Sequence, residues 1–188
     1  IALVEQLGQV FSGLAVSEAN AFATPLGEVP IDEAALADVM QFPQAHLLES
    51  AHAHEHSLEV HLPFLQVVLP SFSLVPLVVG DATGEEICAV LKQLWGGPET
   101  RIVISSDLSH YHDYRAAREL DERTARRIER LEPLTTDQAC GALPLNGLLC
   151  SARHYGLVAR TLDLRNSGDT AGTRSRVVGY GAFAFSER

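Results

Sequence analysis

The sequence has almost no lysine and no long apolar run. Lys92 is the only lysine, and the 188 residues carry a formal net charge of -10. This charge balance argues against a general nucleic-acid-binding surface, which needs a basic face for the phosphate backbone. No apolar run approaches the roughly 20 residues of a membrane span, and no signal peptide is visible. We therefore expect a cytoplasmic protein without nucleic-acid or membrane partners.

Cysteine is also scarce, and several nucleotide and hydrolase motifs are absent. Cys88, Cys140 and Cys150 form an odd set at wide spacing, which favours reduced thiols over a disulfide framework. The sequence contains no GxGxxG, Walker A or GxSxG element. Dinucleotide-dependent, P-loop and α/β-hydrolase functions therefore have no support in the sequence.

Short apolar runs alternate with segments of helical periodicity along the chain. Strands are expected at residues 1–4, 13–16, 72–79, 102–104, 157–164 and 177–185. Helices are expected at residues 32–40, 63–69, 83–95, 113–131 and 145–155, with an earlier start possible for the second. This alternation predicts one α/β domain over residues 1–188, with a central mixed or mainly parallel sheet flanked by helices.

A polar, ionisable loop follows the apolar run at residues 102–104. It offers Asp107, His110, His112 and Asp113, which are acid, base and metal-ligand types. In open α/β sheets, ligands bind outside the carboxyl ends of the strands. We therefore expect residues 103–104 to form a central strand, with Asp107 and His110 close together at its end.

Four histidines gather at residues 52–61. Neutral imidazole is the commonest metal ligand, and neighbouring carboxylates orient it. The spacing lacks the HExxH form of a helical zinc site. His56 and His61 are the better candidates, because each precedes apolar helical residues. For His52 and His54 a surface or capping role is the stronger interpretation.

Cys140 is a further candidate, because together with Gly141 it precedes a predicted helix. A thiol beside a helix N-terminus ionises more readily and can bind metal as a thiolate. The alternative for Cys140 is a buried, inert cysteine. Cys88 and Cys150 lie within amphipathic segments and are interpreted as packing residues.

Several segments resemble the Memo family and occur in that family's order. The first is the EHSLEVHLPF segment at residues 55–64. The others are the SSD and SH motifs within 103–111, the CG and PLNG motifs within 140–147, and the NSGD and VVGY motifs within 166–180. As a set these matches are highly specific and cover nearly the whole chain. Bacterial members of this family are known as protein B of the AmmeMemoRadiSam system.

The resemblance implies a fold similar to class III extradiol dioxygenases (LigB-like), with a metal pocket at one edge of the sheet. In the family, two histidines and one cysteine bind iron or copper, and Cys140 matches that cysteine. Asp107 and His110 match neighbours of the pocket, while Glu55 and His56 lie in the signature segment beside it. The resemblance therefore implies catalytic roles for Asp107, His110, His56 and Glu55, and a metal-ligand role for Cys140.

Two features of the family pattern are absent from this sequence. The family's histidine ligands lie in PHAGY and GPSH motifs, and this chain contains neither. We therefore expect that it lacks the family's N-terminal segment and binds iron or copper weakly or not at all. Three functions stay open: a metal-dependent oxidoreductase or dioxygenase-like enzyme with a small-molecule substrate, a non-catalytic metal- or peptide-binding scaffold, and a structural protein.

Overall fold

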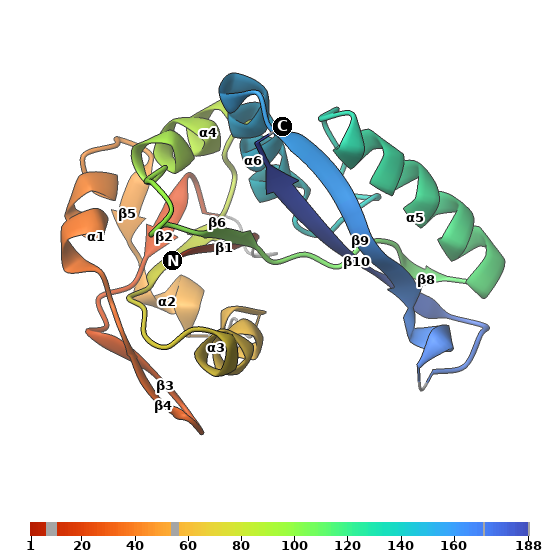
Figure 1. Ribbon diagram of the computed structural model, residues 1–188, viewed down its shortest axis with the longest axis horizontal. Coiled ribbons are helices and arrows are strands. Elements are labelled where there is room, and N and C mark those ends of the chain that lie inside the picture. Colours follow the sequence, from red (N-terminus) through yellow and green to blue (C-terminus); the bar gives the residue numbers. More distant parts are fainter. Residues whose placement is uncertain (7–10, 54–56, 171, 188) are drawn as a thin grey trace. The chain divides into compact units, whose positions relative to one another are not determined.

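The computed structural model describes residues 1–6, 11–53, 57–170 and 172–187. The chain forms two compact units, residues 1–105 and 106–188. Both units contain strands and helices (Figure 1), which confirms the expected α/β class. Among the residues so described, no helix is long and apolar enough to span a membrane.

The first unit is built on a five-stranded mixed sheet with the order β5-β2-β6-β1-β7. Its strands are β1 (Ala2–Gln6), β2 (Leu14–Val16), β5 (Ala45–Leu47), β6 (Val75–Val79) and β7 (Ile102–Ile104). β1 runs parallel to β6 and β7, whereas β2 runs antiparallel to β6. All five residues of β6 are buried, because this strand lies in the middle of the sheet and both of its faces are covered.

The prediction that residues 103–104 form a central strand is wrong. β7 lies last in the strand order and pairs with β1. Its three residues are only half-buried, in contrast to the fully buried β6. A short apolar run indicates a strand but does not distinguish the centre of a sheet from its edge. The polar loop therefore follows an edge strand.

Helices and a hairpin complete the first unit. They are the hairpin of β3 (Ala21–Thr24) and β4 (Gly27–Pro30), with α1 (Glu33–Val39), α2 (Glu49–His52), α3 (Ser57–Val68) and α4 (Gly84–Gln93). The side chain of Asp32 caps α1, and Thr83 and Glu86 form a capping box at α4. Pro63 lies inside α3, so this helix begins before the proline rather than at it.

The second unit contains a separate three-stranded antiparallel sheet with the order β8-β10-β9. Its elements are β8 (His110–His112), α5 (Tyr114–Glu129), α6 (Ala142–Tyr155), β9 (Val158–Asn166), the 3-10 turn η1 (Ser167–Asp169) and β10 (Val177–Ser186). The expectation of one central sheet is therefore wrong for the C-terminal strands. β9 and β10 are joined by a short connection, which favours antiparallel pairing with each other.

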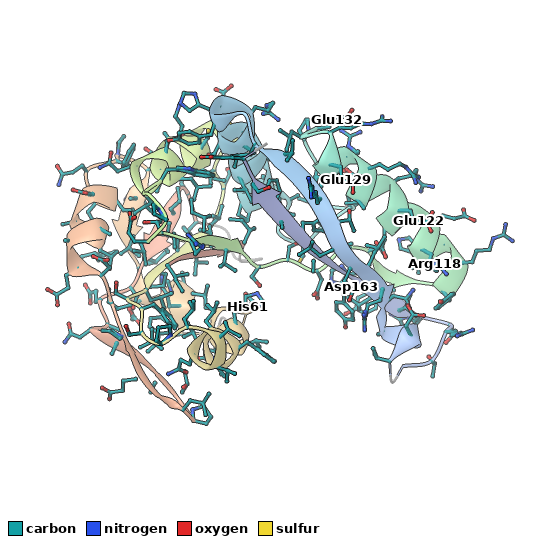
Figure 2. The ribbon with its side chains drawn as sticks, viewed as in Figure 1. His61, Arg118, Glu122, Glu129, Glu132 and Asp163 are labelled. Atoms are coloured by element: carbon teal, nitrogen blue, oxygen red, sulfur yellow. The ribbon has the colours of Figure 1, made fainter. Side chains whose placement is uncertain are left out.

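Helix α5 covers the β9–β10 pair with its apolar side (Figure 1). Ala117, Thr124 and Ile128 are fully buried on this side. On an exposed side of the helix, Arg118 and Glu122 form an ion pair with a nitrogen–oxygen distance of 3.6 Å (Figure 2). Exposed pairs of this kind contribute little to stability, so the buried side holds the helix in place.

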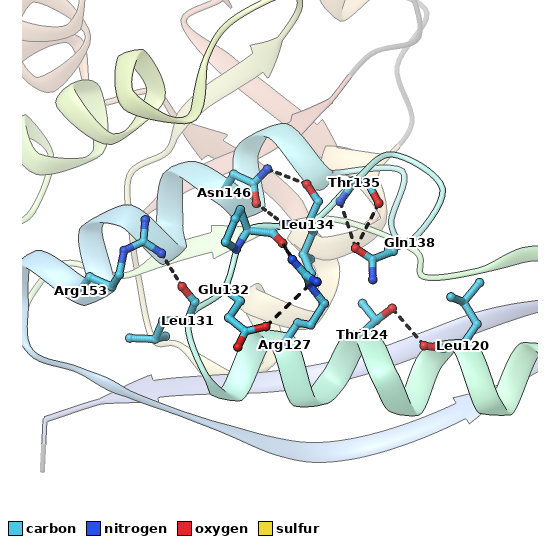
Figure 3. Close-up of polar contacts among 11 residues, drawn as sticks. Leu120, Thr124, Arg127, Leu131, Glu132, Leu134, Thr135, Gln138, Asn146 and Arg153 are labelled. Carbon is cyan, nitrogen blue, oxygen red and sulfur yellow. Dashed lines mark hydrogen bonds and ion pairs between the residues drawn. The ribbon is translucent and has the colours of Figure 1, made fainter.

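Polar contacts fix the connection between α5 and α6 (Figure 3). The side chain of Asn146 accepts a hydrogen bond from the Leu134 N–H and donates one to the Leu134 carbonyl, at 2.7 and 2.9 Å. Arg127 donates to the Pro133 carbonyl, and Arg153 donates to the Leu131 carbonyl. Because both helices hold this connection, the residues that lead into α6 have a defined position.

Gly156 ends α6 in the left-handed conformation, with φ of 66°. A Cβ at this position would meet no atom within 4 Å, so a substitution changes only the backbone energy. We expect Gly156→Ala to lower the free energy of unfolding by about 1 kcal/mol. Gly156→Asn should cost less, because asparagine adopts this conformation more easily. Urea unfolding curves of the two variants test this, and equal stability of Gly156→Ala and the wild type would contradict it.

Candidate functional site

The start of the polar loop and Cys140 come together in the second unit. The backbone N–H of Asp107 donates a hydrogen bond to the Cys140 Sγ, with a nitrogen–sulfur distance of 3.1 Å. The backbone N–H of Cys140 donates in return to the Asp107 carbonyl at 3.2 Å. These two bonds join residues that lie 33 positions apart in the sequence. The N–H directed at the sulfur fixes the orientation of the Cys140 side chain.

Ser106 connects this loop to the start of α6. Its Oγ donates to the Asp107 carbonyl at 2.7 Å and accepts a hydrogen bond from the Gly141 N–H at 2.9 Å. Gly141 is the N-cap residue of α6, so the serine satisfies one of the free N–H groups at the helix end. Cys140 thus lies directly before a helix N-terminus, as the sequence predicted, and its side chain is exposed.

Asp107 and His110 form the second pair of the site. The His110 Nε2 lies 3.7 Å from the Asp107 Oδ2, well within the separation expected for a shared site. Burial raises the pKa of the Asp107 carboxyl, and the attraction of His110 opposes that rise. Asp107 therefore takes up a proton more readily than an ordinary aspartate.

Asp121 is a part of this region that the sequence analysis missed. This α5 residue is buried, and its Oδ1 accepts a hydrogen bond from the Ser109 N–H at 3.0 Å. A sequence signal for it exists, because Asp121 lies on the same helical side as Ala117 and Thr124, where an apolar residue is expected. A charged residue on a buried helix face requires a partner, and Ser109 is that partner.

The structure brings three of the five predicted site residues together. Asp107 contacts both His110 and Cys140, the first through its carboxylate and the second through its backbone. Glu55 and His56 lie outside the described residues. The catalytic and metal-binding roles of all five stay predictions.

His54 also lies outside the described residues, whereas His52 and His61 lie on helices of the first unit. His52 is buried on α2, with its Nε2 at 3.2 Å from the Ala15 carbonyl oxygen. His61 is half-buried on α3 (Figure 2), and this burial lowers the pKa of its imidazole. In the described part of the chain, no three His, Cys, Asp or Glu side chains are grouped closely enough to hold a metal ion.

The cysteines differ from the expectation of three reduced thiols. Cys140 is a free cysteine with an exposed side chain. Cys88 and Cys150 are not free thiols, so the expectation is wrong at these two positions. Among the three, Cys140 is the residue available for metal binding or for chemical modification.

Comparison with known proteins agrees with the motifs and the fold. Residues 8–184 match the family model described as "Memo-like protein", and the chain therefore belongs to the Memo family. It is 36% identical over 187 residues to a MEMO1 family protein of Aquifex aeolicus, a match that covers 89% of this chain and 67% of the relative. It is 33% identical over 178 residues to the MEMO1 family protein SSO0066 of Saccharolobus solfataricus, covering 86% and 63%.

A relative from Methanothermobacter thermautotrophicus, the MEMO1 family protein MTH_45, shows a similar relationship. It is 34% identical over 193 residues, covering 90% of this chain and 66% of the relative. The chain thus spans about two thirds of the length of the curated relatives it matches. These matches confirm the Memo resemblance that the sequence motifs indicated.

Cys140 is expected to be alkylated before Cys88 and Cys150 at neutral pH. Its side chain is exposed and its sulfur accepts the Asp107 N–H, whereas the other two are not free thiols. Brief treatment with iodoacetamide, followed by mass-spectrometric assignment of the modified residues, measures this order. Modification of Cys88 or Cys150 first would contradict the expected reactivity.

His110→Asn is expected to raise the pKa of Asp107 further above its ordinary value. The substitution removes the attraction of His110, which lowers that pKa, and leaves the effect of burial. Carboxyl-carbon NMR titration of Asp107 measures the change, with His112→Asn as the matched control on the same strand. An unchanged Asp107 titration in His110→Asn would show that the two side chains do not interact.

Proposed function

We propose that this protein is a metal-dependent oxidoreductase, with Cys140 as a thiolate ligand of iron or copper. The observation that carries this proposal is the Asp107 N–H directed at the Cys140 Sγ, at 3.1 Å. Hydrogen bonds to a ligand atom orient it and adjust its electron density, as outer partners do in metal sites. Thiolate ligands favour copper and iron over magnesium or calcium.

The described residues fit part of such a site. They supply one sulfur ligand, whereas metal sites use about three protein ligands. The family's two histidine ligands have no counterpart in this sequence. We expect the PHAGY histidine in the part of the relatives' length that this chain does not span, whereas the GPSH position corresponds to residues 5–8, which read EQLG in this sequence. This chain by itself should therefore bind iron or copper weakly.

Asp107 and His110 have the chemistry of a proton-handling pair beside this ligand. The Nε2 of His110 lies 3.7 Å from the Asp107 carboxylate, close enough for the two side chains to interact electrostatically. His110 would accept a proton from a bound substrate at a ring nitrogen. Bound iron or copper would supply the electron-transfer chemistry. The substrate class that we propose is a small molecule with an ionisable hydroxyl group, such as a catechol.

A non-catalytic, peptide-binding scaffold is the second candidate function. Tyr111 favours it, because its side chain is 65% exposed directly beside His110. Its backbone has φ of 62°, and the Arg176 guanidinium lies 4.9 Å from its ring centre. Left-handed conformations of such residues cluster at ligand-binding sites. An exposed aromatic ring held in this way offers a contact for a peptide side chain.

Metal titration of the wild type and of Cys140→Ala tests the first proposal. We expect weak binding of Fe(II) or Cu(I) by the wild type, reduced about tenfold or more in Cys140→Ala, because the substitution removes the sulfur ligand. His112→Asn is the control, since it alters a neighbouring metal-ligand type without touching Cys140. Tight binding that Cys140→Ala leaves unaffected would contradict the proposal and indicate a separate histidine site.

Activity separates the two candidate functions. A protein of the full length of the relatives, loaded with Fe(II), is expected to consume oxygen in the presence of catechols, and its Cys140→Ala variant is not. No turnover with metal bound, together with peptide binding that is lost in Tyr111→Ala, would favour the scaffold. Oxygen consumption identical in the wild type and Cys140→Ala would contradict the oxidoreductase proposal.

A further inference from the structure

Asp121 is the one carboxylate that is buried in the described part of the chain, with 2% of its surface exposed. It occurs in the middle of α5, whose other acidic residues are exposed or half-buried. A buried carboxylate is costly unless strong hydrogen bonds compensate for its lost hydration. Its Oδ1 receives such a bond from the Ser109 N–H at 3.0 Å.

The peptide that Asp121 holds leads directly into His110. Ser109 is fully buried, and its carbonyl accepts a hydrogen bond from the Gly179 N–H at 2.8 Å. The Leu108 N–H donates to the Gly179 carbonyl, also at 2.8 Å. Residues 108–109 are therefore held by β10 through backbone bonds and by α5 through the Asp121 carboxylate.

Gly179 makes this arrangement possible because it has no side chain. A Cβ at this position would lie 2.1 Å from the Asp121 Oδ2 and 2.6 Å from its Cγ. The carboxyl group thus packs against the backbone of β10, which restricts its position. This close approach limits the orientations of the carboxyl group in which its Oδ1 can accept the Ser109 N–H.

The charge of Asp121 also acts on the histidines of β8. Burial raises the pKa of the Asp121 carboxyl, while the Ser109 N–H and the attractions of His112 and His110 oppose that rise. These attractions show that the Asp121 carboxyl interacts electrostatically with both side chains. Asp121 therefore acts on His110 through its charge as well as through the Ser109 peptide.

We infer that Asp121 is a positioning residue, which acts through the Ser109 peptide to hold His110 beside Asp107. The inference rests on the proposed function, because it assigns Asp121 to the same proton-handling pair. Asp121 acts on Asp107 and His110 through its hydrogen bond to the Ser109 N–H and through its charge. It gives the site a second carboxyl that is buried, in addition to the half-exposed Asp107.

The test compares Asp121→Ala, Asp121→Asn and Thr124→Val in the metal-free protein by NMR. Thr124→Val is the matched control, because Thr124 is fully buried on the same helix and its hydroxyl donates to the Leu120 carbonyl (Figure 3). The two readouts are hydrogen exchange of the Ser109 amide and the ring-nitrogen signals of His110. Neither readout needs bound metal or turnover.

Asp121→Ala is expected to accelerate exchange of the Ser109 amide by about tenfold or more and to change the His110 ring signals. Asp121→Asn retains an oxygen acceptor, so exchange should stay within about threefold of the wild type. Its His110 signals should still change, because the negative charge is gone. Thr124→Val should leave both readouts unchanged.

Two results would overturn the inference. One is a set of His110 ring signals that is the same in Asp121→Ala as in the wild type. If Asp121→Ala does not fold, Asp121→Asn decides: exchange of the Ser109 amide accelerated about tenfold or more would show that an oxygen acceptor at position 121 does not hold this peptide. The other is a change in Ser109 exchange and His110 signals in Thr124→Val as large as in Asp121→Ala. Such a result would show that Asp121 contributes only to the packing of α5. Failure of Cys140-dependent metal binding would instead overturn the proposed function and leave these NMR results standing.

Discussion

Two hydrogen bonds between Asp107 and Cys140, one to the cysteine sulfur and one between backbone groups, hold the polar region of the second unit together. The Asp107 N–H donates to the cysteine sulfur at 3.1 Å, and its carbonyl receives the Cys140 N–H at 3.2 Å. Through them the loop after β7 is joined to the start of α6. Because these bonds join residues 33 positions apart, they fix where the polar loop meets the start of α6.

Burial then gives the acidic groups around this join unusual properties. In a chain of net charge -10, most carboxylates are solvated, whereas burial raises the pKa of both Asp107 and Asp121. Each lies near at least one histidine, whose attraction opposes this effect. The same low-polarity surroundings that penalise a lone charge strengthen its interaction with an opposite charge.

Local signals in the sequence predicted many elements correctly because their causes are local. Asp32 and Asp113 cap helices, and Gly156 ends α6, as their residue types indicate. The strand at 102–104 was also expected, but its place at the edge of the sheet was not. Strand order depends on pairings between distant segments, and no apolar run records its partner.

The sequence alone determined the family, the α/β class and the residue types available for chemistry. The order of the motifs indicated the Memo family, and the placement of Cys140 before a helix followed from its neighbours. Only the tertiary structure decided that Asp107 presents its N–H to Cys140, and that a separate antiparallel sheet brings Gly179 against Asp121. The reason is that these contacts join residues 33 or more positions apart, where neither periodicity nor propensity carries information.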